Sequence, residues 1–184
     1  MDETELIRTA QSGDSVAFER LLNLRYDTVY RFAMGWCGCH ADAEDIAQLA
    51  CIKLARGLHQ FKFDAAFTTW LYRLVINCAK DWQRSQGRHA QTEQANDMAD
   101  RDGTHPEATA ADNPEAQVYL RQILSWAERL GEGFKETLVL VCGEGLSHAE
   151  AAHILDVKES TVSWRIHNVR QKLNLLDNEE GDAL

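Results

Sequence analysis

The stretch from Leu146 to Leu173 constrains the fold most, because it has the pattern of two helices joined by a tight turn. Ser147 and Glu150 have the spacing of a capping box, in which a hydroxyl and a carboxylate satisfy free amides at a helix start. A short break at 156–158 separates this first helix from a second one. The second helix has apolar residues at spacings of four, three and four, which predicts one buried stripe made of Val162, Ile166, Val169 and Leu173.

The second helix has a polar start at Glu159, Ser160 and Thr161. The face opposite the buried stripe has polar, basic and aromatic side chains, which are Ser163, Trp164, Arg165, His167 and Arg170. A short helix, a turn and a longer helix with such an outward face are typical of a helix-turn-helix that offers its second helix to a DNA groove. An ordinary helical hairpin remains the alternative that the pattern alone leaves open.

The other periodic segments are also helical, and no segment alternates like a strand, so the sequence predicts an all-α fold. Helical patterns fill residues 1–85, where Asp42 is expected to cap the third helix. Residues 86–113 have no aromatic residue and no helical face, which predicts a flexible acidic linker. A second small helical domain is expected over 114–176, followed by an acidic tail at 177–184.

An acid-rich segment begins the third predicted helix. Asp42, Glu44 and Asp45 are followed there by Gln48. Carboxylates are stabilising at a helix N-terminus, so a solvated capping cluster is one interpretation. A docking site for a basic partner is the other.

Aromatic and basic residues alternate between Phe61 and Arg88. Unpaired bases stack on aromatic rings, and cations hold the phosphates between them. Phe67, Trp70 and Trp82 fall on the inward stripe of the predicted helix and are expected in the core. The loop residues Phe61 and Phe63 remain candidates for contact with nucleic acid.

The helix-turn-helix segment resembles the promoter-reading domain of extracytoplasmic-function sigma factors, the small bacterial initiation factors of the sigma-70 family. Its motif stands as GLS at 145–147, EAA at 150–152 and TVSWR at 161–165. Trp164 departs from the family, which usually has serine at that position. The resemblance implies contacts to the minus-thirty-five element from Ser160, Thr161, Ser163, Trp164, Arg165 and Arg170, with Arg165 at a base edge or a phosphate.

Two further segments resemble the same family, in the same order along the chain. DAED with Gln48 is similar to the segment that docks on RNA polymerase, which implies polymerase-binding roles for Asp42, Glu44, Asp45 and Gln48. FTTWLYRL at 67–74 is similar to the helix that reads the minus-ten element. The resemblance implies contacts there from Phe61, Lys62, Phe63, Asn77, Lys80, Arg84 and Arg88. Non-basic residues at 83 and 85–87 interrupt the arginine run that often ends this helix.

The net charge of −10 is concentrated in a few segments. Three acids lie in residues 2–5, seven acids against one arginine lie in 93–115, and four acids follow from Asp177 onward. The rest of the chain therefore has a modest basic surplus, and overall acidity does not exclude DNA binding. Such a surplus predicts weak DNA affinity for the isolated chain, with a larger partner supplying much of the affinity.

Several classes of site and protein are not expected. Five cysteines at irregular spacings indicate a reducing compartment, and Cys37, Cys39 and His40 lack the spacing of a zinc site. No phosphate loop or catalytic constellation is present, so no enzyme activity, cofactor, metal or small-molecule substrate is expected. No apolar run approaches the ~20 residues of a membrane helix, so membrane insertion is not expected. The expected location is the cytoplasm.

The resemblance implies an alternative sigma factor whose partners are core RNA polymerase, promoter DNA and an anti-sigma factor. One rival is a sigma-like decoy that binds an anti-sigma factor without binding DNA. Another is a conventional helix-turn-helix regulator, which would bind DNA as a dimer without polymerase. In vitro transcription with purified core enzyme separates the three.

Overall fold

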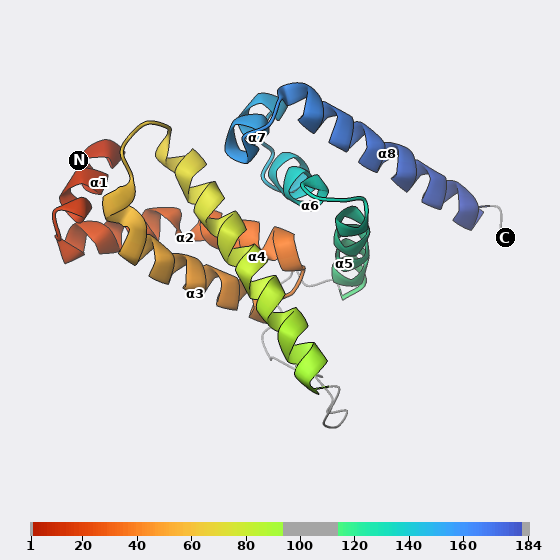
Figure 1. Ribbon diagram of the computed structural model, residues 1–184, viewed down its shortest axis with the longest axis horizontal. Helices are drawn as coiled ribbons and strands as arrows, with labels where there is room; N and C mark the ends of the chain where they lie inside the picture. The colour runs from red at the N-terminus through yellow and green to blue at the C-terminus, as the bar shows by residue number, and fades with distance from the viewer. Residues whose placement is uncertain (1, 94–113, 182–184) are drawn as a thin grey trace.

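The computed structural model describes residues 2–93 and 114–181, and within these ranges every regular element is a helix. In chain order the elements are α1 (Glu3–Gln11), α2 (Ser15–Cys37), α3 (His40–Gly57), η1 (Leu58–Gln60), α4 (Phe67–Glu93), α5 (Pro114–Arg129), α6 (Phe134–Leu138), η2 (Val139–Gly143), α7 (His148–Leu155) and α8 (Glu159–Gly181). The predicted all-α class is confirmed (Figure 1). Among the described helices, none combines the length and apolar character needed to cross a bilayer.

Aspartates begin the first two helices. Asp2 Oδ1 accepts a hydrogen bond from the Glu5 amide at 2.7 Å, and Asp14 Oδ1 accepts one from the Ala17 amide at 2.8 Å. The cap predicted at Asp42 is wrong, because α3 already begins at His40 and no side chain caps it. Asp42 lies in the first turn of α3, where a carboxylate still complements the helix dipole.

Helices α1 to α4, the N-terminal helices, enclose the larger part of the core. Helix α1 packs on α2, and α2 and α3 both contact α4. Large apolar side chains fill the space between them almost without exposure: Leu21, Phe32, Ile46, Leu54, Leu71 and Val75. Burial of one such side chain stabilises a fold by about 1.5–3 kcal/mol, so this layer dominates the stability of the N-terminal helices.

Helix α4 extends further than the sequence pattern indicates. The helical pattern predicts an end near residue 85, whereas α4 continues to Glu93. Residues 86–93 contain alanine, arginine and glutamine, which favour helix, and a single interior glycine costs only about 1 kcal/mol. The predicted linker at 86–113 therefore begins later, and its remainder lies outside the described residues.

Helices α5 to α8, the C-terminal helices, contain the helix-turn-helix. The capping box is confirmed: the Ser147 amide donates to Glu150 Oε2 at 2.8 Å, and the Glu150 amide donates to Ser147 Oγ at 3.2 Å. Asp156 ends α7 in the left-handed conformation with φ 54°, which aspartate tolerates better than most residues. Val162, Ile166 and Val169 of α8 are buried as predicted, and Leu173 is partly exposed.

The two groups of helices lie against each other and share one apolar core (Figure 1). Helix α2 contacts α5 and η2, and α4 contacts α7. Val139 and Leu140 of η2 are buried in the same cluster as Phe32 and Tyr72. The described chain is therefore in a closed arrangement, with the helix-turn-helix beside α4.

Candidate nucleic-acid and polymerase interface

Helix α8 presents a polar face that begins directly after the turn. Its buried stripe packs against α6 and α7, which leaves Ser160, Trp164, His167 and Arg170 exposed. The row from 160 to 170 is about 15 Å long at 1.5 Å per residue. That length suits a major groove about 12 Å wide, into which the N-terminal part of a recognition helix fits.

Thr161 and Ser163 are only half-exposed, at the edge of this face. Ser163 Oγ lies 2.8 Å from His148 Nδ1, so a side chain of α7 is hydrogen-bonded to a side chain of α8. His148 is not among the residues that the sequence pattern singles out, so this contact was missed. The bond links the two helices of the motif at the start of the exposed row.

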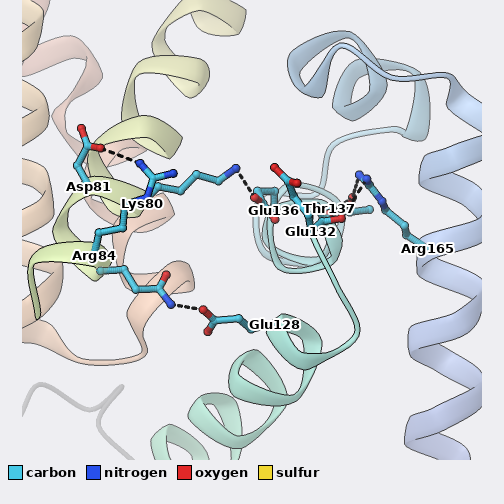
Figure 2. A network of polar contacts seen from close by, with 10 residues as sticks. Lys80, Asp81, Arg84, Glu128, Glu132, Glu136, Thr137 and Arg165 are labelled. Atoms are coloured by element: carbon cyan, nitrogen blue, oxygen red, sulfur yellow. Dashed lines mark hydrogen bonds and ion pairs between the residues drawn. The ribbon is translucent and has the colours of Figure 1, made fainter. Parts of the chain in front are cut away.

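Arg165 does not point outward with the rest of the row. Its guanidinium donates to Thr137 Oγ1 at 3.3 Å and to the Glu132 carbonyl at 3.2 Å (Figure 2). The guanidinium also lies over the Phe134 ring, 6.0 Å from the centroid. Arg165 precedes the buried Ile166, so its side chain lies at the flank of the stripe and reaches the loop before α6.

Trp164 is the largest exposed side chain in the row from 160 to 170, at 56% exposure. Its ring packs edge-on against Phe134, with centroids 5.4 Å apart and planes at 62°. Such a pair contributes ~0.5–1.5 kcal/mol beyond area burial and limits the rotamers of the exposed ring. Phe134 is therefore a supporting residue that the sequence pattern does not single out.

The loop before α4 is closed by aromatic packing. Phe61 is only 5% exposed, and its ring meets those of Phe63, Phe67 and Trp70 at centroid distances of 4.7–5.6 Å. The faces predicted for stacking on a base are thus already covered, and in this conformation Phe61 is a core residue. Lys62 is exposed beside it, and Phe63 is half-buried.

The predicted core residues of α4 differ in burial. Phe67 is buried, as expected, whereas Trp70 and Trp82 are each partly exposed. Phe63 adopts a positive φ of 63°. The Arg8 guanidinium lies over the Phe63 ring, with its Cζ 4.8 Å from the ring centroid. The loop is thereby joined to α1 as well as to α4.

The basic residues of α4 are divided between two faces of the helix. Asn77 and Arg84 are exposed, and Arg84 Nη1 lies 3.3 Å from Asp81 Oδ1. Lys80 turns to the C-terminal helices and pairs with Glu136 Oε1 at 2.6 Å (Figure 2). The predicted minus-ten residues are thus not all on one accessible face. The Arg88 side chain lies outside the described residues.

Asp81 is the centre of a small charge cluster on the exposed face. Its Oδ2 accepts from Lys53 Nζ of α3 at 2.7 Å. That hydrogen bond lowers the pKa of Asp81 and raises the pKa of Lys53. Both side chains are well exposed, so the pair contributes little to stability and fixes side-chain positions locally.

The acid-rich start of α3 is mostly accessible. Glu44, Asp45 and Gln48 are exposed, whereas Asp42 is half-buried beside the C-terminal helices. One turn further along, Leu49 and Ile52 are 38% and 43% exposed. Acids next to exposed apolar side chains on one helix are typical of a protein-docking surface. Leu49 and Ile52 were missed in the sequence because they adjoin the buried stripe.

The residues Cys37, Cys39 and His40 do not come together as a ligand set. Cys37 Sγ donates to the Ala33 and Cys39 carbonyls at 3.0 and 3.2 Å, and burial raises the pKa of its thiol to about 11. His40 Nδ1 lies 2.7 Å from the Tyr30 hydroxyl. In the described parts of the chain, no three His, Cys, Asp or Glu side chains are grouped closely enough to hold a metal ion.

Comparison with known sequences agrees with the resemblance in the motifs. The family described as Sigma-70 region 2 matches residues 21–89. The ECF RNA polymerase sigma-E factor of Haemophilus influenzae is 31% identical, with 94% of each chain covered. The factor of the same name from Escherichia coli is 32% identical, with 92% of this chain and 91% of the relative covered.

Two solved structures have the same fold. CnrH in complex with the cytosolic domain of CnrY has a TM-score of 0.67 at 23% identity, covering 95% of this chain and 96% of that one. RpoE of Bartonella quintana, in complex with the anti-sigma factor NepR, has a TM-score of 0.64 at 22% identity. The match covers 88% of this chain and 96% of that one. With relatives above 30% identity over nearly their whole length, the chain belongs to the family of extracytoplasmic-function RNA polymerase sigma factors.

Proposed function

We propose that this protein is an alternative sigma factor that binds core RNA polymerase and directs it to a specific set of promoters. The observation that carries this proposal is the match over almost the whole chain to sigma-E factors. The exposed polar face of α8 and the acidic, partly apolar face of α3 support it, because a sigma factor needs both a DNA-reading and a polymerase-binding surface. The factor acts by positioning the polymerase, and catalysis belongs to the polymerase itself.

The polymerase contact is proposed on the exposed face of α3. Glu44, Asp45 and Gln48 supply charge and hydrogen-bond acceptors, and Leu49 and Ile52 supply apolar area. Charge-assisted bonds to arginines on the partner orient the complex and speed encounter. Asp42 contributes less in this arrangement, since it is half-buried.

The minus-ten contact is proposed at the loop before α4 and along its exposed face. Lys62, Asn77 and Arg84 are accessible for phosphate or base contacts. Phe61 and Phe63 form the aromatic wall that supports this loop. Lys80 becomes available only when its ion pair with Glu136 opens. A contact from Arg88 is also part of the proposal.

The minus-thirty-five contact is proposed on α8. Ser160, Trp164 and Arg170 are exposed along one row, and Thr161 and Ser163 lie at its edge. Polar side chains of this kind bind base edges or phosphates, and the Trp164 ring offers apolar contact to a thymine methyl group. Arg165 supports this row from behind through its contacts with the loop before α6.

The proposed domain division is 1–85 for polymerase and minus-ten binding and 114–176 for minus-thirty-five binding. An anti-sigma factor is the proposed regulator, because a chain of the same fold is solved as RpoE bound to the anti-sigma factor NepR. Because the proposed action is on polymerase, we also propose a cytoplasmic location.

In vitro transcription with purified bacterial core polymerase tests the function directly. Addition of the purified chain should produce run-off transcripts from a subset of genomic fragments, and core enzyme alone should not. A chain that binds core without directing transcripts from any fragment supports the decoy instead. A chain that binds DNA as a dimer and ignores polymerase supports the conventional regulator.

A further inference from the structure

Helix α1 lies beside the loop before α4, which consists of residues 61–66. It packs on α2 through the buried Leu6, Ile7 and Ala10, and it also contacts η1 (Figure 1). The family model matches residues 21–89, so that match assigns no role to α1. Two polar side chains of α1 nevertheless reach the loop, and both are directed at residues proposed to contact the minus-ten element.

One side-chain amide of α1 is bonded to two backbone carbonyls at the start of the loop. Gln11 Nε2 donates to the Leu58 carbonyl at 2.9 Å and to the Phe61 carbonyl at 2.8 Å. A primary amide has two N–H groups, so both donors of Gln11 are used. Leu58 begins η1 and Phe61 directly follows it. Gln11 therefore fixes how the chain leaves η1 and enters the loop.

A cation of α1 lies over the next aromatic residue of the loop. Arg8 Cζ is 4.8 Å from the centroid of the Phe63 ring, and that ring packs against Phe61 with centroids 4.7 Å apart. Arg8 and Gln11 are three residues apart, so they lie on the same side of α1. Together they hold the two residues on either side of the exposed Lys62.

The backbone of Phe63 needs this support. Its φ of 63° is in the left-handed region, which bulky residues rarely adopt. Strained residues of this kind persist only where the surrounding structure holds them, and they gather at functional sites. Without the contacts from α1 the loop would relax to other conformations, and Lys62 would move with its neighbour.

We infer that α1 is a brace for minus-ten reading, in which Arg8 and Gln11 are positioning residues. They hold the loop in a conformation that presents Lys62 to the DNA strand, and they do not contact the DNA themselves. The inference rests on the proposed function, because the loop is part of the proposed minus-ten contact. Movement of the loop to other conformations lowers the apparent affinity for the minus-ten strand in proportion to the competent fraction that is lost.

Hydrogen–deuterium exchange in the free, full-length chain tests the brace without polymerase. Gln11→Met preserves the length of the side chain and removes both donors. Amides in the peptide covering 58–66 should then exchange about tenfold faster, as loss of two hydrogen bonds predicts. Thr9→Val is the matched control, because Thr9 Oγ1 donates within α1, to the Glu5 carbonyl at 2.9 Å. It should leave exchange in the loop unchanged, and thermal melts verify that both variants are folded.

Binding of a single strand by the holoenzyme tests whether the brace affects reading. The probe is the non-template strand of the minus-ten element from a promoter identified by run-off transcription. Gln11→Met should weaken binding of this strand about threefold to tenfold and reduce discrimination against substituted bases. Its affinity for core polymerase and for the minus-thirty-five duplex should not change. A general loss of folding would lower all of these together.

Arg8 variants separate the brace from a direct DNA contact. Arg8→Ala should weaken strand binding about twofold to fivefold, the range of an exposed cation–π contact, and should speed exchange in the loop. Arg8→Lys keeps a cation over the ring and should restore most of the loss. Arg20→Ala makes the same change of charge at an exposed position of α2 and should have no effect. A phosphate contact from Arg8 would instead weaken all sequences equally without changing loop exchange, which would overturn its positioning role.

The remaining outcomes distinguish the brace from the proposed function. The brace is overturned if Gln11→Met leaves loop exchange unchanged. It is equally overturned if loop exchange rises while strand binding and base discrimination stay at their wild-type values. A wild-type chain that directs no transcript contradicts the proposed function, and the role in minus-ten reading is refuted with it. Faster loop exchange in Gln11→Met would then still show that α1 sets the conformation of the loop.

Discussion

The Arg165 guanidinium donates a hydrogen bond to Thr137 Oγ1 at 3.3 Å, inside the C-terminal helices. Thr137 is completely buried, and its hydroxyl in turn donates to the Gly133 carbonyl at 2.6 Å. A residue of the recognition helix is thus connected through a buried hydroxyl to the loop that precedes α6. Arg165 therefore stabilises α8 from within the C-terminal helices rather than extending its exposed polar face.

Replacing Arg165 with alanine should destabilise the C-terminal helices and weaken promoter reading. Loss of two hydrogen bonds from a charged donor is expected to lower the free energy of unfolding by about 1–3 kcal/mol. Promoter-specific run-off transcription should fall more than core binding in a pull-down, since α3 is unchanged. Arg170→Ala, at an exposed position, should reduce DNA binding with little loss of thermal stability. Equal loss of transcription and core binding by Arg165→Ala contradicts this role.

Gly133 should tolerate an added side chain less well than Gly145 does. Its φ of 84° is in the left-handed region, and an added Cβ would collide with the Arg165 guanidinium. Gly133→Ala is therefore expected to cost about 1–3 kcal/mol from backbone strain, with further loss from displacing Arg165. Gly145→Ala is the matched control, because Gly145 has φ 68° and open space around its Cα. Thermal melts that show the same loss for both variants would refute the contact with Arg165.

A charge on the apolar part of α3 should weaken binding to core polymerase. Ile52 is 43% exposed beside the acidic row, so Ile52→Asp removes apolar contact area without opening the core. We expect about tenfold weaker binding to core enzyme, which corresponds to about 1.4 kcal/mol, measured by fluorescence anisotropy of the labelled chain. Val118→Asp, at a 51% exposed position on α5, should leave the affinity unchanged. Unaltered binding by Ile52→Asp would place the polymerase contact elsewhere.

The cysteines should differ widely in reactivity. Burial raises the pKa of Cys37 and of Cys78 to about 11, so at pH 8 almost none of either thiol is the reactive thiolate. Cys142 is exposed and should be the first cysteine to react with iodoacetamide. Mass spectrometry of the peptides measures the extent of alkylation at each cysteine. Because a raised pKa means that thiolate forms only at higher pH, alkylation of Cys37 should accelerate as pH rises toward 11. Rapid alkylation of Cys37 at pH 8 in the folded protein would contradict its burial.

The helices and the capping box could be predicted from the sequence because they depend on local spacing. Ser147 with Glu150, the stripe of Val162, Ile166 and Val169, and the apolar positions of α3 all follow the helical period. The end of α4 could not be predicted in this way, since residues 86–93 have no apolar face and are helical on propensity alone. The start of α3 at His40 was missed for a similar reason, because no side chain caps it.

The motifs indicate which residue types form the candidate site but not how their side chains are oriented. Glu44 and Asp45 of α3 and the exposed row of α8 are accessible, and Asp42 is half-buried. Phe61 and Arg165, by contrast, are turned into the protein, toward an aromatic cluster and the loop before α6. Arg165 lies at the flank of a buried stripe, where the helical period does not decide between core and surface. Phe61 lies in the loop after η1, to which no helical period applies.

By itself, the sequence determined the helical class, the helix-turn-helix and the order of the three family motifs, because each depends on residues close together in the chain. Only the tertiary structure decided that Glu144 meets Arg31 and Tyr72, 113 and 72 residues away in sequence. It also decided that Lys80 faces Glu136 instead of solvent. Pairing between distant charges depends on how two packed surfaces are placed against each other, and no local pattern of residues encodes that placement.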